Sequence, residues 1–136
     1  MVKIDAVYKG GLHCRITHGP SGKIMDTDAP KDNMGRGESF SPTDLTAASL
    51  LTCMLTTMGI VAKKENFEFK NASGEITKEM APSPDRKIAR LTVSIQMPKG
   101  LPKEKRAALE KTALTCPVYK SLNPSIKITA AFNYED

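Results

Sequence analysis

An α+β fold is predicted by the order of extended and helical segments along the 136 residues. Alternating apolar and polar residues predict strands in separate groups, and a long apolar segment between two groups is typical of a helix. The predicted order is β-β-β-α-β-β-α-β. Because the strands come in runs, an α+β domain is favoured over a parallel α/β sheet. The length corresponds to one domain, which we expect to span residues 1–136.

The N-terminal part is predicted to form three strands. Residues 2–8 and 12–17 alternate between apolar and polar side chains, and the two glycines between them predict a β-hairpin. Residues 23–28 follow as a third strand. A polar loop is expected over residues 31–40, and it carries Arg36 between two glycines.

The central helix has its own start signal. Ser41 is a preferred capping residue, Pro42 suits the first helical position, and Asp44 complements the cap. From there to about Lys64 the sequence is apolar on nearly every side, and its polar residues are mostly Thr and Ser, whose hydroxyls can bond back to helix carbonyls. We therefore expect the central helix of the core, buried on most of its faces.

The second half of the chain predicts further strands and a second helix. Residues 66–71 and 74–80 are read as one interrupted strand, and residues 90–97 show the clearest alternation in the sequence. A helix with one charged side is expected over residues 102–115. Residues 126–134 alternate again and predict a closing strand.

Composition argues against two classes of partner. The net charge of +5 comes from scattered basic residues, aromatic residues make up 5%, and tryptophan is absent, so a nucleic-acid interface is not expected. The first residues lack an apolar signal segment, and no stretch approaches the ~20 apolar residues that a spanning helix needs. We expect a cytoplasmic protein with no membrane contact.

The three cysteines do not predict a disulfide framework, because their number is odd and they are widely spread. Cys14 alternates with apolar Leu12 and Ile16 and is expected to face the core. His13 would point to the opposite side of the same strand, so a metal site is not expected. The sequence contains no motif for a metal, a phosphate or a serine nucleophile.

The other two cysteines allow two interpretations each. Cys53 lies within the apolar helix, where it is either a small core residue or a reactive thiol. The residues three and four positions from it are Ser49, Leu50, Thr56 and Thr57. Cys116 precedes Pro117 and a new helical turn, where it is either a thiol with a lowered pKa or a substitute for a capping serine.

Two motifs together resemble a known family. Residues 35–53, GRGESFSPTDLTAASLLTC, place a Ser-Pro-x-x-Leu helix start just before Cys53, and Cys-Pro-Val-Tyr-Lys-Ser-Leu begins 63 positions later at Cys116. In this order they resemble the OsmC/Ohr family of osmotically inducible and organic hydroperoxide resistance proteins. The resemblance covers essentially the whole chain, including its element order.

This resemblance implies an intertwined homodimer in which antiparallel sheets wrap around long central helices, with the active sites at the subunit interface. It also implies that Cys53 is the peroxidatic thiolate, which attacks a peroxide and becomes a sulfenic acid. Cys116 then resolves the sulfenic acid as a disulfide, and an external dithiol reduces the pair. No bound cofactor or metal is implied.

A cation and a carboxylate are also implied beside the reactive sulfur. We favour Arg36 as the cation because it lies in the matching block, with Arg15 as the alternative. The glutamate that many family members carry directly after the motif proline is replaced by Thr43. Glu38 is the candidate replacement, with Asp44 as the alternative unless it serves only as a cap.

The expected function is a thiol-dependent peroxidase that reduces organic hydroperoxides or hydrogen peroxide in oxidative stress defence. The departure at Thr43 places the chain in a general OsmC-like branch and motivates an alternative. In that alternative, the same fold senses redox state without turnover or binds a small apolar ligand. A purely structural role is the third hypothesis.

Overall fold

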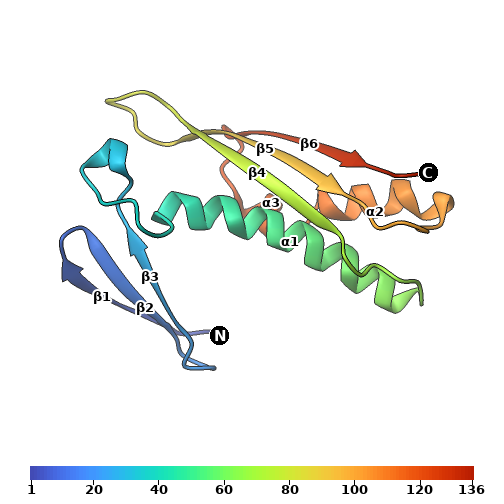
Figure 1. The fold of residues 1–136 in the computed structure, drawn as a ribbon, viewed down its shortest axis with the longest axis horizontal. Coiled ribbons are helices and arrows are strands. Elements are labelled where there is room, and N and C mark those ends of the chain that lie inside the picture. Colours follow the sequence, from blue (N-terminus) through green and yellow to red (C-terminus); the bar gives the residue numbers. More distant parts are fainter. The chain divides into compact units, whose positions relative to one another are not determined.

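The computed structural model describes residues 1–136 as two compact units, Met1–Thr46 and Ala47–Asp136 (Figure 1). The first unit contains a three-stranded sheet, and the second contains another three-stranded sheet packed with helices. The predicted α+β class is confirmed, and so is the order of the main elements. The single domain over residues 1–136 stays a prediction.

The first unit is built on an antiparallel sheet with the order β1-β2-β3. Its strands are β1 (Ile4–Gly10), β2 (His13–His18) and β3 (Ile24–Asp28), as the alternation predicts. A short 3₁₀ helix, η1 (Lys31–Asn33), opens the loop that follows. The hairpin and third strand are therefore confirmed.

The two faces of this sheet differ in chemistry. Residues directly opposite in an antiparallel pair point to the same side, so the register pairs His13 with Asp28 and Arg15 with Asp26 on one face. The other face carries apolar side chains that include Ile4, Tyr8, Ile16 and Met25. The first unit thus presents one mainly apolar face and one face on which charged residues stand beside Val7 and Ile24.

The long helix α1 (Pro42–Lys64) begins with a reciprocal cap. The backbone N–H of Asp44 donates to the Ser41 hydroxyl at 3.0 Å, and the N–H of Ser41 donates to the Asp44 carboxylate at 2.9 Å. Along the helix, the hydroxyls of Thr52 and Thr57 donate to carbonyls four residues earlier at 2.9 and 2.8 Å. Both features agree with the sequence prediction.

Burial of α1 is narrower than the sequence predicts. The buried residues of this helix form one stripe: Ala47, Leu50, Met54, Met58 and Ala62. The remaining residues are partly or fully exposed, and Ile60 has 48% of its surface exposed. The expectation of burial on most faces is wrong for this chain by itself, because within the second unit the sheet covers one side of the helix (Figure 1).

α1 is also the one helix of the chain that is long and apolar enough to cross a membrane. The expectation that no stretch approaches such a length is therefore wrong. Length and composition alone are weak evidence of a membrane span, because the core helix of a soluble protein passes the same test.

The second sheet has the order β4-β5-β6 and is mixed. Strands β4 (Ser73–Met80) and β5 (Ile88–Gln96) are antiparallel, whereas β5 and β6 (Lys127–Asn133) are parallel. The expectation of antiparallel sheets is therefore wrong for the pair of β5 and β6. The segment between β5 and β6 contains helices, which supply the long crossover that parallel strands need.

Two predicted elements are shorter in the structure. Residues 66–71 are not a strand, because Asn66 and Asn71 adopt left-handed backbone angles, with φ of 58° and 69°, that interrupt an extended chain. The helix predicted over residues 102–115 divides into the 3₁₀ helix η2 (Lys103–Lys105) and α2 (Arg106–Ala113).

Close packing joins the sheet to α1. A Cβ atom at Gly74 of β4 would lie 2.9 Å from Leu51 Cδ1 and 3.0 Å from the Ser94 carbonyl oxygen, so glycine permits this approach. The core between them includes Leu91, Val93 and Ile95 of β5. This arrangement fixes the middle of α1 against the second sheet.

Candidate active site

Cys53 lies near the middle of α1, in the second unit. Its side chain is half-buried and packs beside the core cluster. Leu50 and Met54 of the same helix are fully buried in the core cluster and hold the helix against it. Cys53 is therefore placed on a rigid element, and its side chain remains partly exposed.

Cys116 caps the short helix α3 (Pro117–Ser121) and is 1% exposed. The backbone N–H of Tyr119 donates to the Cys116 sulfur at 3.4 Å, and the N–H of Val118 supplies a second donor. Leu109 and Ala113 of α2, on the N-terminal side of the cysteine, are fully buried in the core. The capping interpretation of Cys116 is confirmed.

The structure brings Cys53 and Cys116 together as free thiols. Their side chains form a hydrogen bond, and no disulfide joins them. Two adjacent thiols, one half-buried and one buried, are the arrangement that intramolecular thiol oxidation requires. The sequence separates them by 63 positions, so only the fold makes them neighbours.

The pKa of the Cys116 thiol is raised, not lowered. Burial disfavours the thiolate most, and the N–H of Tyr119 offsets only part of that effect. The hydrogen bond with Cys53 adds to the increase by keeping the proton on Cys116. Of the two interpretations of Cys116, the lowered pKa is therefore not the one that the structure supports, because desolvation outweighs the backbone donors.

Arg36 and Glu38 both lie in the loop between η1 and α1, in the first unit. Both residues are exposed. Arg36 Nη2 is close to the β1–β2 turn, since a Cβ atom at Gly11 would lie 3.4 Å from it. The Glu38 backbone N–H donates to Asp28 Oδ2 at 3.1 Å. The structure thus brings these two predicted residues together on one loop.

Asp28, at the end of β3, organises this loop and was not singled out by sequence reasoning. Its side chain is buried and accepts from Glu38 N–H, while its other oxygen lies 2.6 Å from His13 Nδ1. The His13 hydrogen bond is the largest cause of a lowered Asp28 pKa, and the Arg36 charge contributes. The available signal was an acidic residue at the end of the third predicted strand, together with a histidine at the start of the strand before it.

Loop geometry adds a strict requirement at Gly35. A Cβ atom there would lie 1.8 Å from the Ala29 carbonyl oxygen, which no side chain can accommodate. Backbone hydrogen bonds close the same turn, from Gly35 N–H to the Pro30 carbonyl at 2.9 Å and from Gly37 N–H to the Ala29 carbonyl at 3.2 Å. The residues flanking Arg36 therefore fix its backbone.

The alternative candidates are placed differently. Arg15 Nε is 3.2 Å from Asp26 Oδ1 on the face of the first sheet that carries the charged residues. Asp44 caps α1, as described above. Cys14 is half-buried on β2 and does not belong to the core cluster, so its expected core position is wrong.

Most of the chain, including both cysteines of the pair, matches a known protein family. The family profile described as OsmC-like protein matches residues 35–131, which include the Arg36 loop, Cys53 and Cys116. The chain belongs to the OsmC family. A search of curated proteins found no match.

Solved structures of OsmC-family and related proteins share the fold. A Psychrobacter arcticus protein, provisionally described as an osmotic stress induced and detoxification response protein, is 38% identical, with a TM-score of 0.91 over 98% of this chain and 96% of that chain. The organic hydroperoxide resistance protein OhrB of Bacillus subtilis is 24% identical, with a TM-score of 0.66 over 98% of each chain. An organic hydroperoxide resistance protein from Legionella pneumophila is 18% identical, with a TM-score of 0.74 over 98% and 96%.

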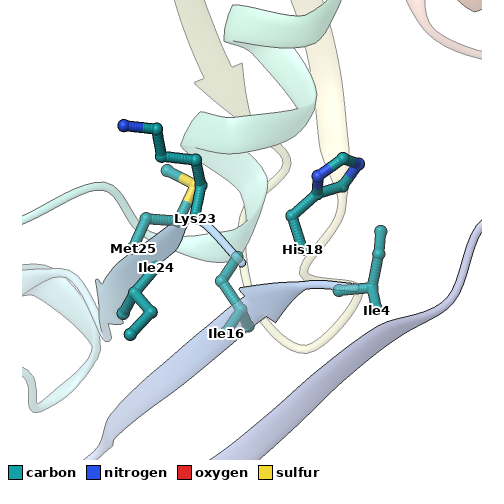
Figure 2. Close-up of a pocket in the computed structure, with 6 residues that line it drawn as sticks. All are labelled: Ile4, Ile16, His18, Lys23, Ile24 and Met25. Atoms are coloured by element: carbon teal, nitrogen blue, oxygen red, sulfur yellow. The ribbon is translucent and has the colours of Figure 1, made fainter. Parts of the chain in front are cut away.

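The first unit of this OsmC-family chain also has an apolar hollow of about 220 Å³ on its sheet. It is lined by residues of all three strands and the turn before β3, as Figure 2 shows: Ile4, Ile16, His18, Lys23, Ile24 and Met25. Ile4 and Ile24 have 64% and 61% of their surface exposed. The chain by itself therefore leaves a considerable apolar surface open to water.

We expect Asp28→Asn to loosen the Arg36 loop of this OsmC-family protein. The amide lacks the charge that holds His13 and Arg36, and it retains one oxygen to accept the Glu38 N–H. Hydrogen exchange at the Glu38 amide should become faster. Asp26→Asn, on the same face but less buried, is the matched control and should leave that amide unchanged.

The same contact has a predictable pH dependence. Because the pKa of Asp28 in the fold lies below its ordinary value of 3.8, its stabilising effect is complete above that value and is lost as the pH falls through the lower, folded pKa. Glu38 amide exchange in the wild type should therefore increase under strongly acidic conditions. Equal protection in wild type and Asp28→Asn at pH 7 would contradict this role.

Proposed function

We propose that this OsmC-family protein is a thiol-dependent peroxidase that reduces organic hydroperoxides or hydrogen peroxide. The observation that carries the proposal is the pair of free, adjacent thiols, with Cys53 half-buried on a rigid helix and Cys116 buried at the start of α3. Two structural relatives are described as organic hydroperoxide resistance proteins, which agrees with this substrate class.

The reaction uses ordinary thiol chemistry. The Cys53 thiolate attacks one oxygen of the peroxide, the O–O bond breaks, and the other oxygen leaves as an alcohol or water after taking a proton. Cys53 becomes a sulfenic acid. The Cys116 sulfur then attacks the Cys53 sulfur, water leaves, and a disulfide forms. An external dithiol restores both thiols, so the proposed cycle needs no bound cofactor.

In this proposal, Arg36 stabilises the Cys53 thiolate and Glu38 orients the cation. Support comes from the loop, where both residues are exposed and where Asp28 and the flanking glycines fix the backbone around them. The rival cation, Arg15, is already paired with Asp26. A neighbouring cation favours a thiolate because opposite charges lower a thiol pKa.

We also propose that the protein acts as a homodimer in the cytoplasm. The support is the apolar surface that the single chain leaves uncovered, namely the outer side of α1 and the apolar face of the first sheet. Burial of such surface contributes about 25 cal/mol per Å², so a second copy that covers it would be strongly stabilised. Sedimentation at micromolar concentration should give twice the mass of 14.8 kDa.

A turnover assay tests the peroxidase proposal. With excess dithiol, purified protein should consume many equivalents of cumene hydroperoxide per chain, and Cys14→Ser should behave like the wild type. Consumption that stops after one equivalent supports the alternative, a redox sensor on the same fold. No oxidation of either Cys53 or Cys116 by the peroxide would contradict both.

The raised pKa of Cys116 predicts a pH-dependent second step. Below that pKa the thiolate fraction of Cys116 rises about tenfold per pH unit, and only the thiolate attacks the sulfenic acid. We therefore expect the Cys53 sulfenic acid to persist longer at pH 6.5 than at pH 8.5. Trapping with dimedone after a fixed delay measures this, and a yield that does not fall with rising pH would contradict it.

A further inference from the structure

We infer that the reducing dithiol attacks the sulfur of Cys53, and that Cys116 is always the leaving thiol. This inference rests on the proposed disulfide cycle and deepens it by assigning a direction to the reductive step. It is carried by the unequal access to the two sulfurs. Cys116 is 1% exposed inside the core cluster, whereas Cys53 is half-buried beside it.

Access decides which sulfur reacts. A thiolate must approach a disulfide sulfur from the side opposite the bond that breaks, so a sulfur enclosed by core residues cannot be reached. Cys116 caps α3 and lies in the same cluster as Leu109 and Ala113. Within the chain, Cys53 lies half-buried beside that cluster, so attack at Cys53 requires no opening of it.

Backbone donors partly stabilise Cys116 as the leaving thiolate, although burial raises its pKa. As the disulfide breaks, the bonding electron pair moves to the Cys116 sulfur, where the N–H groups of Tyr119 and Val118 donate to it. Burial then favours the protonated Cys116 thiol, which takes its proton from the second thiol of the reductant.

Protonation gives the reaction its direction. A Cys116 thiol is a poor nucleophile and does not attack the mixed disulfide that now joins Cys53 to the reductant. The second thiol of the dithiol attacks its own sulfur in that mixed disulfide, and Cys53 leaves as a thiolate. The products are a cyclic disulfide of the reductant and the reduced protein, so atoms and electrons balance.

Peptide mapping with a monothiol tests the assignment. The Cys53–Cys116 disulfide is first made with diamide, so that this step does not depend on peroxidase activity. A brief pulse of 2-mercaptoethanol, an acid quench and alkylation with N-ethylmaleimide follow. Trypsin places the two cysteines in separate peptides, residues 37–63 and 112–120.

The expected result is the mercaptoethanol adduct on peptide 37–63 and N-ethylmaleimide on peptide 112–120, in at least tenfold excess over the reverse. An adduct on Cys116, or equal amounts on both peptides, would overturn the inference. If diamide does not link the two peptides, the disulfide on which the inference rests cannot form, and the inference is overturned. A disulfide that forms with diamide but not with peroxide would instead contradict the proposed function alone.

A matched pair of variants adds a kinetic readout. Tyr119→Pro removes the backbone donor to the Cys116 sulfur, whereas Tyr119→Ala keeps that donor and removes the same ring. We expect reduction of the disulfide to be about tenfold slower in Tyr119→Pro than in Tyr119→Ala, because the leaving thiolate loses a hydrogen bond. Equal rates in two folded variants would contradict a role for this amide.

Discussion

Cys53→Ser lowers dithiol-dependent peroxide consumption to the rate of buffer containing dithiol alone. The loss is expected to reach at least about a thousandfold, because a hydroxyl at ordinary pH is a far weaker nucleophile than a thiolate and forms no sulfenic acid. The substitution is nearly isosteric on a half-buried position of α1, so the fold should be unchanged. Initial rates with cumene hydroperoxide measure the effect.

Cys14→Ser is the matched control for this variant. Cys14 is also half-buried and free, but it lies on β2 in the first unit, whereas the hydrogen-bonded pair belongs to the second unit. Loss of activity in Cys14→Ser, with activity retained in Cys53→Ser, would show that the nucleophile had been assigned to the wrong cysteine.

Cys116→Ser separates the first chemical step from the second. We expect the first equivalent of peroxide to react at an unchanged rate, because Cys53 is intact. No intramolecular disulfide can then form, so the sulfenic acid persists and excess peroxide converts it to sulfinic acid. Steady-state consumption should fall about tenfold or more and should decline during the assay as this irreversible product accumulates.

The substitution is informative because serine can replace the structural role of Cys116. Serine is a preferred capping residue, and its hydroxyl can accept the N–H of Tyr119 as the sulfur does. Mass spectra after excess peroxide should show sulfinic acid on Cys53 in Cys116→Ser and a disulfide in the wild type. A disulfide-free wild type with undiminished turnover in the variant would contradict the resolving role.

Much of the fold was predictable because local patterns were strong. The alternation in β1, β2 and β5 and the Ser41–Asp44 cap of α1 each specify an element without help from distant residues. The parallel pairing of β5 with β6 was not predictable, because strand direction depends on the helical crossover and not on side-chain alternation. Residues 67–70 alternate clearly between apolar and polar side chains, but left-handed asparagines at positions 66 and 71 override the pattern.

The candidate site was predictable in its residues and not in its electrostatics. The paired motifs identify Cys53 and Cys116 because their spacing and order are specific. The raised pKa of Cys116 depends on how deeply the fold buries a capping residue, which no local pattern reports. Asp28 was missed for a similar reason, since its importance comes from contacts with His13 across the sheet and with the later loop at Glu38.

The central claim is that peroxide oxidises Cys53 and that Cys116 closes on it. Its most direct test is tryptic mapping of reduced wild-type protein after one equivalent of cumene hydroperoxide, without added thiol. The account predicts one major product, a disulfide joining peptides 37–63 and 112–120, with Cys14 still reduced. Unmodified Cys53 and Cys116 after the peroxide has been consumed, or oxidation confined to Cys14, would contradict it.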